Sequence, residues 1–358
     1  MSPAPRLSIV IPTLNEDARI GALIEQIARQ TLVAECEVII ADGGSSDDTL
    51  AQARLAAERH CVKLDAVISP HGRGLQMNSG ARAAQASDVL FLHADSDLPE
   101  ADLLAMALAA MEAARSRFGP RVAGHFPLRF ARHDCERSLM YFFFEAKTAL
   151  NRLECINGDQ GMWFSAEYFV QLGGFDSTLA YLEDARIARR VFASGVWITL
   201  PGHLVTSARR FESEGFARRQ ALNALLRTCD VVGLHRYLER ATTAYREQRD
   251  TGPLRLAPFL SELGQALDDE GWRSTLVYLG RAGHFLTVQT WQLAFWWDCR
   301  RAFLAQRIAH PMLAPTLGMF DRWIAPLVTS LAGVVPTTVV LIVAWRTHRL
   351  IRVVRKYS

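Results

Sequence analysis

The sequence has little of what marks a disulfide-stabilised or zinc-binding protein. Its cysteines are few and scattered, with no C-x-x-C pair, at Cys36, Cys61, Cys135, Cys155, Cys229 and Cys299. This usage favours reduced thiols in a cytosolic setting over a disulfide framework or a zinc site. The residues after Met1 lead into a strand-like run without a signal-peptide pattern, so we expect no N-terminal leader.

The sequence also has little net charge. A formal net charge of +3 over 358 residues argues against a dedicated nucleic-acid-binding protein, and we expect no nucleic-acid partner. Internal repeats and low-complexity tracts are absent from the sequence. The length exceeds what one compact core usually needs, so we predict two regions. The polar stretch Arg246–Pro253 contains helix breakers and places the boundary between residues 1–246 and residues 247–358.

The first region alternates strand-like and helix-like segments. The expected strands are Leu7–Ile11, Glu37–Ala41, Val62–Ile68 and Val89–Leu92, and the expected helices are Arg19–Gln30, Leu50–Arg59, Gly74–Ala84 and Ala101–Ala114. This order predicts an α/β fold with a mostly parallel sheet flanked by helices. Ligands of such sheets bind at the carboxyl ends of the strands, where Asp42 and Asp95 fall. Further along, Phe216–Tyr237 is expected to form one long helix.

Asp95-Ser96-Asp97 ends an apolar run that is typical of a short buried strand. Two carboxylates at this spacing can share one hard cation, Mg²⁺ or Mn²⁺, which in proteins typically also binds substrate phosphates. The alternative is an acidic, solvated turn, since a motif this short also occurs without a metal.

The last third of the chain is apolar. Ala282–Trp297 has no charge apart from His284, and Trp323–Trp345 is 23 residues long without a charged side chain. The tail that follows is basic, with Arg346, Arg349, Arg352, Arg355 and Lys356 and no acid. These features predict a helical, membrane-associated region with the C-terminus and the first region on the cytoplasmic side. A buried helical hairpin, broken at Pro326 and Pro336, is the alternative.

Several segments together resemble the family 2 glycosyltransferases, which have the GT-A (Rossmann-like) fold. They are Ser8–Glu16, Ile39–Thr49, Asp95–Asp97 and Gly173–Asp176 followed by Leu182–Asp184. Gly72–Gly80 and Gly158–Gly161 look like a smaller bacterial subgroup whose substrates are largely uncharacterised. The resemblance covers about residues 6–245, and the chain beyond residue 250 carries none.

The resemblance implies an inverting, metal-dependent hexosyltransferase that uses a nucleotide-diphosphate sugar, with Mg²⁺ or Mn²⁺ as cofactor and a lipid or lipid-linked acceptor among the candidates. It assigns the nucleotide to Pro12, Glu16, Asp42, Arg73 and Asp95, and the metal to Asp95 and Asp97. Of the metal pair, Asp97 is expected to make the more direct contact. For Glu16, Asp42 and Arg73 the alternatives are an exposed loop acid, a turn former and a solvated arginine.

Asp184 matches the catalytic base of the family, although an acid in the first turn of a helix also stabilises the helix dipole. Asp159 and Gln160 are expected to line the acceptor side, unless they form a buried turn. Arg209 and Arg210 are candidates for phosphate binding or a surface basic pair.

Two other functions remain open on the sequence alone. A nucleotidyltransferase would want a glycine-rich, lysine-bearing loop after the first strand, and Pro12–Glu16 contains neither residue type. A non-catalytic membrane scaffold that kept only the fold would not need Asp42, Asp95, Asp97 and Asp184 together.

Overall fold

The computed structural model describes residues 4–134, 136–178, 181–246, 248, 252–309 and 313–357. They fall into two compact units, which we call the N-terminal and the C-terminal unit. The N-terminal unit comprises the described residues up to Ala208 together with Ala309, and the C-terminal unit comprises the rest.

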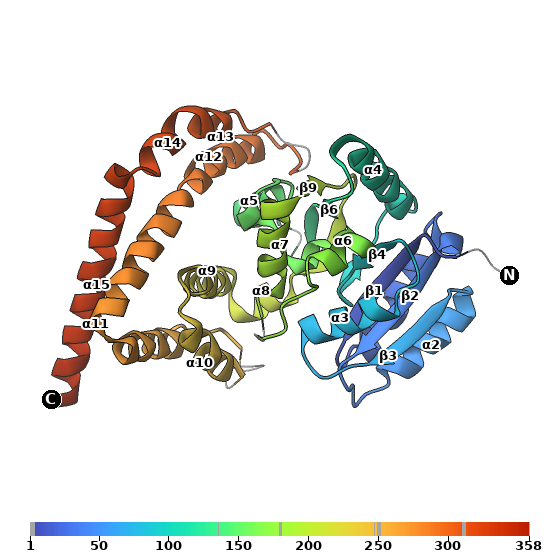
Figure 1. Cartoon of the computed structure of the whole chain (residues 1–358), viewed down its shortest axis with the longest axis horizontal. Helices are drawn as coiled ribbons and strands as arrows, with labels where there is room; N and C mark the ends of the chain where they lie inside the picture. The colour runs from blue at the N-terminus through green and yellow to red at the C-terminus, as the bar shows by residue number, and fades with distance from the viewer. Residues whose placement is uncertain are drawn as a thin grey trace. The chain divides into compact units, whose positions relative to one another are not determined.

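A seven-stranded sheet forms the centre of the N-terminal unit (Figure 1). Its order is β3 (Leu64–Ile68), β2 (Cys36–Asp42), β1 (Leu7–Thr13), β4 (Asp88–Phe91), β8 (Met162–Ser165), β6 (Val122–His125) and β9 (Val196–Thr199). All neighbouring pairs are parallel except those that β8 makes with β4 and β6. A smaller sheet has the order β5 (Ser96–Asp97), β10 (Leu204–Ser207) and β7 (Leu128–Ala131).

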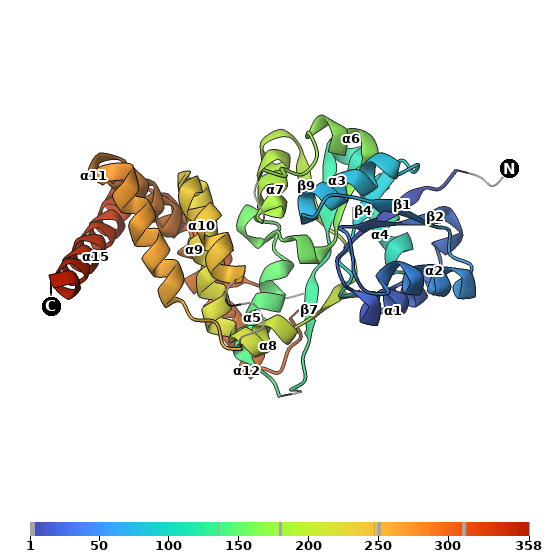
Figure 2. The same cartoon turned by 90° about the horizontal axis from the view of Figure 1, so that it is seen from below.

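Helices cover both faces of the large sheet, as Figure 2 shows. One face is packed by α1 (Asp17–Ala28), α2 (Thr49–His60) and α4 (Leu103–Phe118), and the other by α3 (Arg73–Ala83), α6 (Ala166–Gln171) and α7 (Glu183–Ser194). The remaining elements are α5 (Leu139–Thr148) and the 3₁₀ turns Val33–Glu35, Leu153–Cys155 and Gly158–Gln160.

The large sheet has a hydrophobic core on each face, and the side chains of its strands point alternately into one core and the other. Leu7, Ile9 and Ile11 of β1 pack toward α1 and α2, whereas Val10 packs toward α3. A strand that is buried on both faces reads as a continuous apolar run, as the sequence of β1 does. The predicted fold class, a mostly parallel sheet flanked by helices with a helical C-terminal region, is confirmed.

The C-terminal unit is helical. Its elements are α8 (Arg209–Glu214), α9 (Phe216–Val232), α10 (His235–Arg246), α11 (Ala257–Val288), α12 (Trp291–Leu304), α13 (Pro315–Met319), the π-helical turn Phe320–Ile324, α14 (Ala325–Val328) and α15 (Leu331–Tyr357). In α11, Gly271 has a φ of 77° and introduces a kink. Helices α11 and α15 lie side by side, and α9 and α10 also pack on α11.

Two expectations differ from this arrangement. The long helix expected over Phe216–Tyr237 is wrong, because Gly233 adopts a φ of 87° and ends α9. The boundary expected at residues 246 and 247 differs from the division after Ala208, because α9 and α10 pack with α11.

The apolar segments of the C-terminal unit are broken rather than continuous. Ala282–Trp297 spans the end of α11 and the start of α12, and Trp323–Trp345 runs through the π-helical turn, α14 and α15. Among the described residues, no single helix has the length and apolar composition to cross a bilayer. The pair Pro315–Val328 and Ala332–Thr347, bent by 70°, meets those two criteria jointly.

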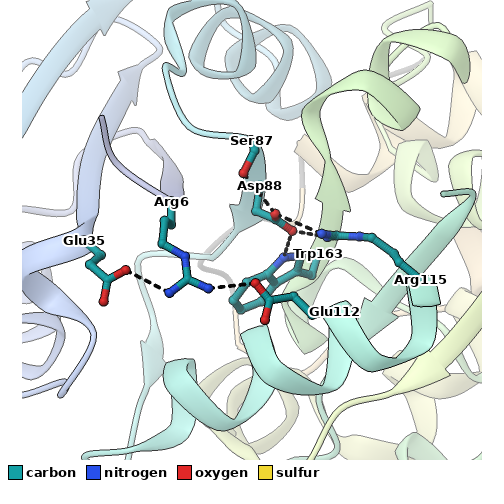
Figure 3. Close-up of polar contacts among 7 residues, drawn as sticks. All are labelled: Arg6, Glu35, Ser87, Asp88, Glu112, Arg115 and Trp163. Carbon is teal, nitrogen blue, oxygen red and sulfur yellow. Dashed lines mark hydrogen bonds and ion pairs between the residues drawn. The ribbon is translucent and has the colours of Figure 1, made fainter. Parts of the chain in front are cut away.

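A buried carboxylate at the start of β4 joins three elements (Figure 3). The side chain of Asp88 is 4% exposed and accepts hydrogen bonds from Trp163 Nε1 of β8 at 2.7 Å and from Arg115 Nη1 of α4 at 3.1 Å. The second Arg115 amino group also donates to it, and Ser87 Oγ lies at 3.4 Å. This network lies at the amino end of β4, away from the carboxyl edge of the sheet, so we assign it to stability.

Asp88→Asn should lower the free energy of unfolding by about 3 kcal/mol, because a buried ion pair that loses one charge leaves its partner uncompensated. Glu112→Gln is the matched control: Glu112 pairs with Arg6 at 2.7 Å, but the two side chains are 53% and 47% exposed (Figure 3). An exposed pair contributes less than about 1 kcal/mol. Urea denaturation of both variants measures the difference, and equal losses would contradict the assignment.

Candidate active site

Side chains from several elements meet at the carboxyl edge of the large sheet. Gln76 of α3 donates hydrogen bonds from Nε2 to the carbonyl oxygens of Thr13 at 2.7 Å and Ala41 at 2.9 Å. Gly43 has no side chain here because a Cβ would lie 3.0 Å from the Gln76 amide. These contacts hold the start of α3 over the ends of β1 and β2.

Asp42 shapes the turn that follows β2. One carboxylate oxygen accepts hydrogen bonds from Thr13 Oγ1 at 3.0 Å and Ser45 Oγ at 2.5 Å, and the other accepts from the backbone N–H groups of Gly44 and Ser45 at 3.0 and 2.8 Å. Burial opposes its ionisation, but these bonds outweigh burial and lower the pKa of Asp42. With the residue 1% exposed, the structure favours the turn-forming role, and direct nucleotide contact stays a prediction.

The loops after β1 and β2 are tied to each other. Asn15, at a φ of 57°, donates its N–H to Ser45 Oγ at 2.9 Å and accepts from the Ser46 N–H at 2.9 Å. The N–H of Glu16, at the start of α1, donates to Thr49 Oγ1 at 2.8 Å. Pro12 is paired with Ala41 in the parallel register. The structure thus brings Pro12, Glu16 and Asp42 to one edge.

Arg73 opens α3 and points into a cluster of acids. Its Nε lies 2.6 Å from Glu183 Oε1, and Nη1 lies 3.4 Å from His93 Nε2. The negative charge of Glu183, joined by Asp184, Asp159 and Asp95, raises the pKa of Arg73 above its ordinary value. The Arg73 side chain is 39% exposed, so it can still meet a ligand. The alternative of a simple solvated arginine does not fit this position.

Glu183 is the buried partner in this pair, with a side chain 2% exposed. Burial raises the pKa of Glu183, the charge of Arg73 opposes that rise, and the neighbouring Asp184 adds to it. In the sequence, Glu183 entered only as part of the segment Leu182–Asp184. Its ion pair with Arg73 is a long-range contact for which the sequence offers no local signal.

His93 connects the arginine to Asp159. Its Nδ1 lies 2.9 Å from Asp159 Oδ1, and its Nε2 faces Arg73. Because a guanidinium only donates, a hydrogen bond between the two side chains requires Nε2 to accept, with the ring hydrogen on Nδ1. Gly158 allows the approach of the ring, since a Cβ there would lie 3.2 Å from Nε2.

Asp184 lies in the first turn of α7. Its Oδ2 accepts the N–H of Gly158 at 2.7 Å, and its Oδ1 accepts the N–H of Ala185 at 2.7 Å. The preceding Leu182 has a φ of 69°, a left-handed conformation that is uncommon for a branched side chain. Such a conformation persists where surrounding contacts enforce it, which is frequent at functional sites.

The Gly-Gly-Phe-Asp segment holds the chain that leads to α7. The Asn78 amide donates to the Phe175 carbonyl at 2.8 Å and accepts the Phe175 N–H at 2.8 Å. Gly174, at a φ of 68°, lies so close that a Cβ would come within 2.7 Å of Asn78 Oδ1. Burial opposes ionisation of Asp176, but hydrogen bonds from Thr178 and the ion pair with Arg186 lower its pKa to about 2.

The two carboxylates of the predicted metal pair have different surroundings. Asp95, with a side chain 38% exposed, lies 3.9 Å from Arg19 Nη1 and acts electrostatically on Arg73. Asp97 instead accepts a hydrogen bond from Gln26 Nε2 of α1 at 2.7 Å. This placement favours Asp95 as the principal ligand, whereas the sequence favoured Asp97.

The donor set at this edge fits a hard divalent cation that shares its coordination with a ligand. Among the described residues, no group of three or more His, Cys, Asp or Glu side chains forms a self-sufficient metal site. Mg²⁺ in proteins is usually held by one or two carboxylates together with substrate phosphates and water, which matches Asp95 as a lone protein anchor.

The remaining predicted residues are distributed differently. Gln160 is 0% exposed, and its amide bonds the Asn157 N–H at 2.7 Å and the Thr148 carbonyl at 2.8 Å, so it forms the buried turn that was the alternative. Arg209 and Arg210 open α8 in the C-terminal unit, where both are exposed, and their contact with phosphate stays a prediction.

Comparison with known proteins gives a family match for part of the chain, which ends before Glu183 and Asp184. Residues 8–173 match the family model described as glycosyl transferase family 2. The match covers just under half of the chain, and it agrees with the family expected from the motifs.

Curated relatives are similar over a shorter stretch. A "PGL/p-HBAD biosynthesis glycosyltransferase" of Mycobacterium tuberculosis is 42% identical over 106 residues, which cover 28% of this chain and 40% of the relative. A "Dolichyl-phosphate beta-glucosyltransferase" of Drosophila melanogaster is 30% identical over 119 residues, or 30% of this chain and 36% of the relative. The chain therefore spans well under half the length of these two relatives.

Among solved structures, the chain resembles a mannosyltransferase, PcManGT from Pyrobaculum calidifontis, in complex with GDP-Man and Mn²⁺. The TM-score is 0.48 at 20% sequence identity, over 95% of this chain and 87% of that one.

Glu183→Gln should lower the free energy of unfolding by about 2 kcal/mol, because it removes a charge-assisted bond to Arg73 inside the fold. The loss is smaller than for a fully buried pair, since Arg73 is partly exposed. Asp159→Asn is the matched control at a side chain 48% exposed, and should cost less than about 1 kcal/mol. Chemical denaturation measures the free energy of unfolding of both variants. A larger decrease for Asp159→Asn than for Glu183→Gln would contradict the prediction.

Proposed function

We propose that the N-terminal unit transfers a hexose from a nucleotide-diphosphate sugar to an acceptor hydroxyl, with inversion at the anomeric carbon. The observation that carries this proposal is the position of Asp184. Its carboxylate accepts the N–H of Gly158, and it lies beside the ion pair of Arg73 and Glu183. The family match supports the reaction class.

Asp184 is the proposed general base. In the transfer, the acceptor oxygen forms a bond to the anomeric carbon while the bond from that carbon to the diphosphate oxygen breaks. The acceptor proton moves to an Asp184 carboxylate oxygen, and the nucleoside diphosphate leaves with the electron pair. A carboxylate oxygen accepts two hydrogen bonds, so the single backbone bond that each one makes leaves room for the acceptor hydroxyl.

Arg73 is the proposed phosphate contact. Its guanidinium can present donors to the diphosphate oxygens while Nε keeps its bond to Glu183. A bound Mg²⁺ or Mn²⁺ would supply further positive charge to the leaving diphosphate, and Asp95 would hold it. Glu16 and Asp42 lie at the same edge of the sheet, and we propose that they contact the nucleotide.

The acceptor is proposed to be a lipid or a lipid-linked hydroxyl compound. The name of the Drosophila relative contains a lipid phosphate, dolichyl-phosphate, which supports this class of acceptor. Asp159, with a side chain 48% exposed next to His93, is the residue proposed to face the acceptor. A hydrolysis screen over UDP-, GDP- and dTDP-sugars with Mg²⁺ or Mn²⁺ would identify the donor, and loss of all turnover in EDTA would support the metal.

Asp184→Asn should reduce turnover by about 10²-fold or more, because the amide cannot accept a proton at neutral pH. Donor affinity should change little, since the substitution preserves size. Asp65→Asn in β3, an exposed position, is the matched control and should keep normal turnover. Near-normal turnover of Asp184→Asn would place the base elsewhere.

Asp95→Asn should weaken Mn²⁺-dependent binding of the nucleoside diphosphate by about tenfold or more, since it removes a hard ligand. Asp97→Asn should have a smaller effect, because Asp97 is bonded to Gln26. Isothermal titration with and without Mn²⁺ separates the two. A larger loss for Asp97→Asn would restore Asp97 as the principal ligand.

A further inference from the structure

From Ala332 to Trp345, the outward face of α15 lacks the charged side chains that are typical of a surface helix. Its exposed positions include Val335, Val339, Val340 and Val343, which are 53%, 51%, 66% and 57% exposed. No charged residue occurs from Ala332 to Trp345. A surface helix normally carries its charged residues on this face, whereas a helix that is apolar all round is buried or in contact with lipid.

The opposite face of α15 is already occupied. Thr337 Oγ1 lies 3.1 Å from Thr287 Oγ1 of α11, and a Cβ on Gly283 of α11 would come within 2.1 Å of Thr338 Oγ1. The valines therefore point away from the packed side. This arrangement differs from the buried hairpin considered from the sequence, in which both faces would be covered.

The elements that precede α15 in the chain also carry exposed apolar side chains. Of the 25 exposed large apolar side chains among the described residues, 14 lie between Leu293 and Val343. Outside α15 they are Leu293, Trp296, Trp297, Leu304, Ile308, Leu313, Met319, Trp323, Ile324 and Leu327. We call these ten residues and the four valines the apolar face. Apolar clustering of this kind marks an interaction surface in a water-exposed protein.

Positive charge accompanies the apolar face. Residues 291–358 contain nine Lys or Arg and two Asp residues. One of the two, Asp298, is 3% exposed and accepts the N–H groups of Thr316 and Leu317 at 3.1 and 2.9 Å, so it is turned inward. The surplus cations therefore make this region complementary to a negatively charged partner.

Tryptophan and arginine occur together at this surface. The guanidinium of Arg300 lies 5.5 Å from the ring centre of Trp297, and that of Arg322 lies 5.0 Å from the ring of Trp323. Tryptophan is enriched at the boundary between lipid and water, and arginine there keeps its charge at the level of the headgroups. These two pairs fit the polar rim of a lipid contact.

We propose that the C-terminal unit docks through the apolar face onto an anionic lipid bilayer. Valine, leucine and tryptophan would enter the acyl region, and the arginines would meet lipid phosphates. The bent pair Pro315–Val328 and Ala332–Thr347 lies in the interface or re-enters it. An anionic leaflet is cytoplasmic, which places the N-terminal unit in the cytoplasm. The docking does not depend on the proposed sugar transfer.

Vesicle flotation of the full-length chain tests the docking without any activity measurement. The protein, diluted from detergent, is mixed with vesicles of phosphatidylcholine alone or with phosphatidylglycerol, and floated through a density gradient. We expect it to float with anionic vesicles at least about tenfold more than with neutral ones, because several arginines contribute. Brominated lipids should quench part of the tryptophan fluorescence, since Trp296, Trp297 and Trp323 are exposed.

A double variant, Val340→Asp with Val343→Asp, places two charges on the apolar face. It should lose most of the flotation, since a charge in the acyl region is costly. Val170→Asp in α6 is the matched control, 75% exposed in the N-terminal unit, and should float normally.

Four outcomes would overturn the proposal or a part of it. The chain could stay at the bottom of the gradient with every vesicle, or the double variant could float as the original chain does. Alternatively, the chain could form a dimer in solution that the double variant dissociates while neither floats, which would assign the face to a second copy. Equal flotation with neutral vesicles would overturn the choice of an anionic surface.

Discussion

The ion pair between Arg73 and Glu183 is the contact on which the geometry of the candidate site depends. It joins the first residue of α3 to the first residue of α7, two helices that are more than a hundred positions apart in the sequence. Arg73 also faces His93, which in turn contacts Asp159. The Arg73 guanidinium therefore links the start of α7 directly to the loop after β4. Through His93 and Asp159 it also links these two segments to the turn at Gly158.

This pair is stable because its surroundings favour both charges. Glu183 is almost fully buried, and an isolated charge there would be unfavourable, so the residue needs its cation. Arg73 gains from several carboxylates at once and stays charged. The excess of acids over cations in the cluster also explains why an anionic diphosphate would need additional positive charge to bind beside them.

Much of the fold could be predicted from the sequence, since strands β1, β2 and β4 are short apolar runs that end in polar residues. Motif order also located Asp42 and Asp95 at one edge, because parallel strands end on the same side of a sheet. Sequence spacing could not separate Asp95 from Asp97, since their difference lies in the distant Gln26. The roles of Gln160 and Glu183 depend on similar long-range contacts, which local patterns do not encode.

The loops after β1 and β2 have a thermodynamic consequence for any ligand at this edge. Hydrogen bonds of Asn15, Asp42 and Ser45 fix the backbone at Asn15 and at residues 44–46, and these bonds form without a ligand. Ordering one residue costs about 1–2 kcal/mol in conformational entropy. Here these residues are already ordered in the folded protein, so ligand binding does not have to order them. A ligand that binds to these preordered loops loses less free energy to loop ordering, so its affinity is higher than for the same contacts with flexible loops.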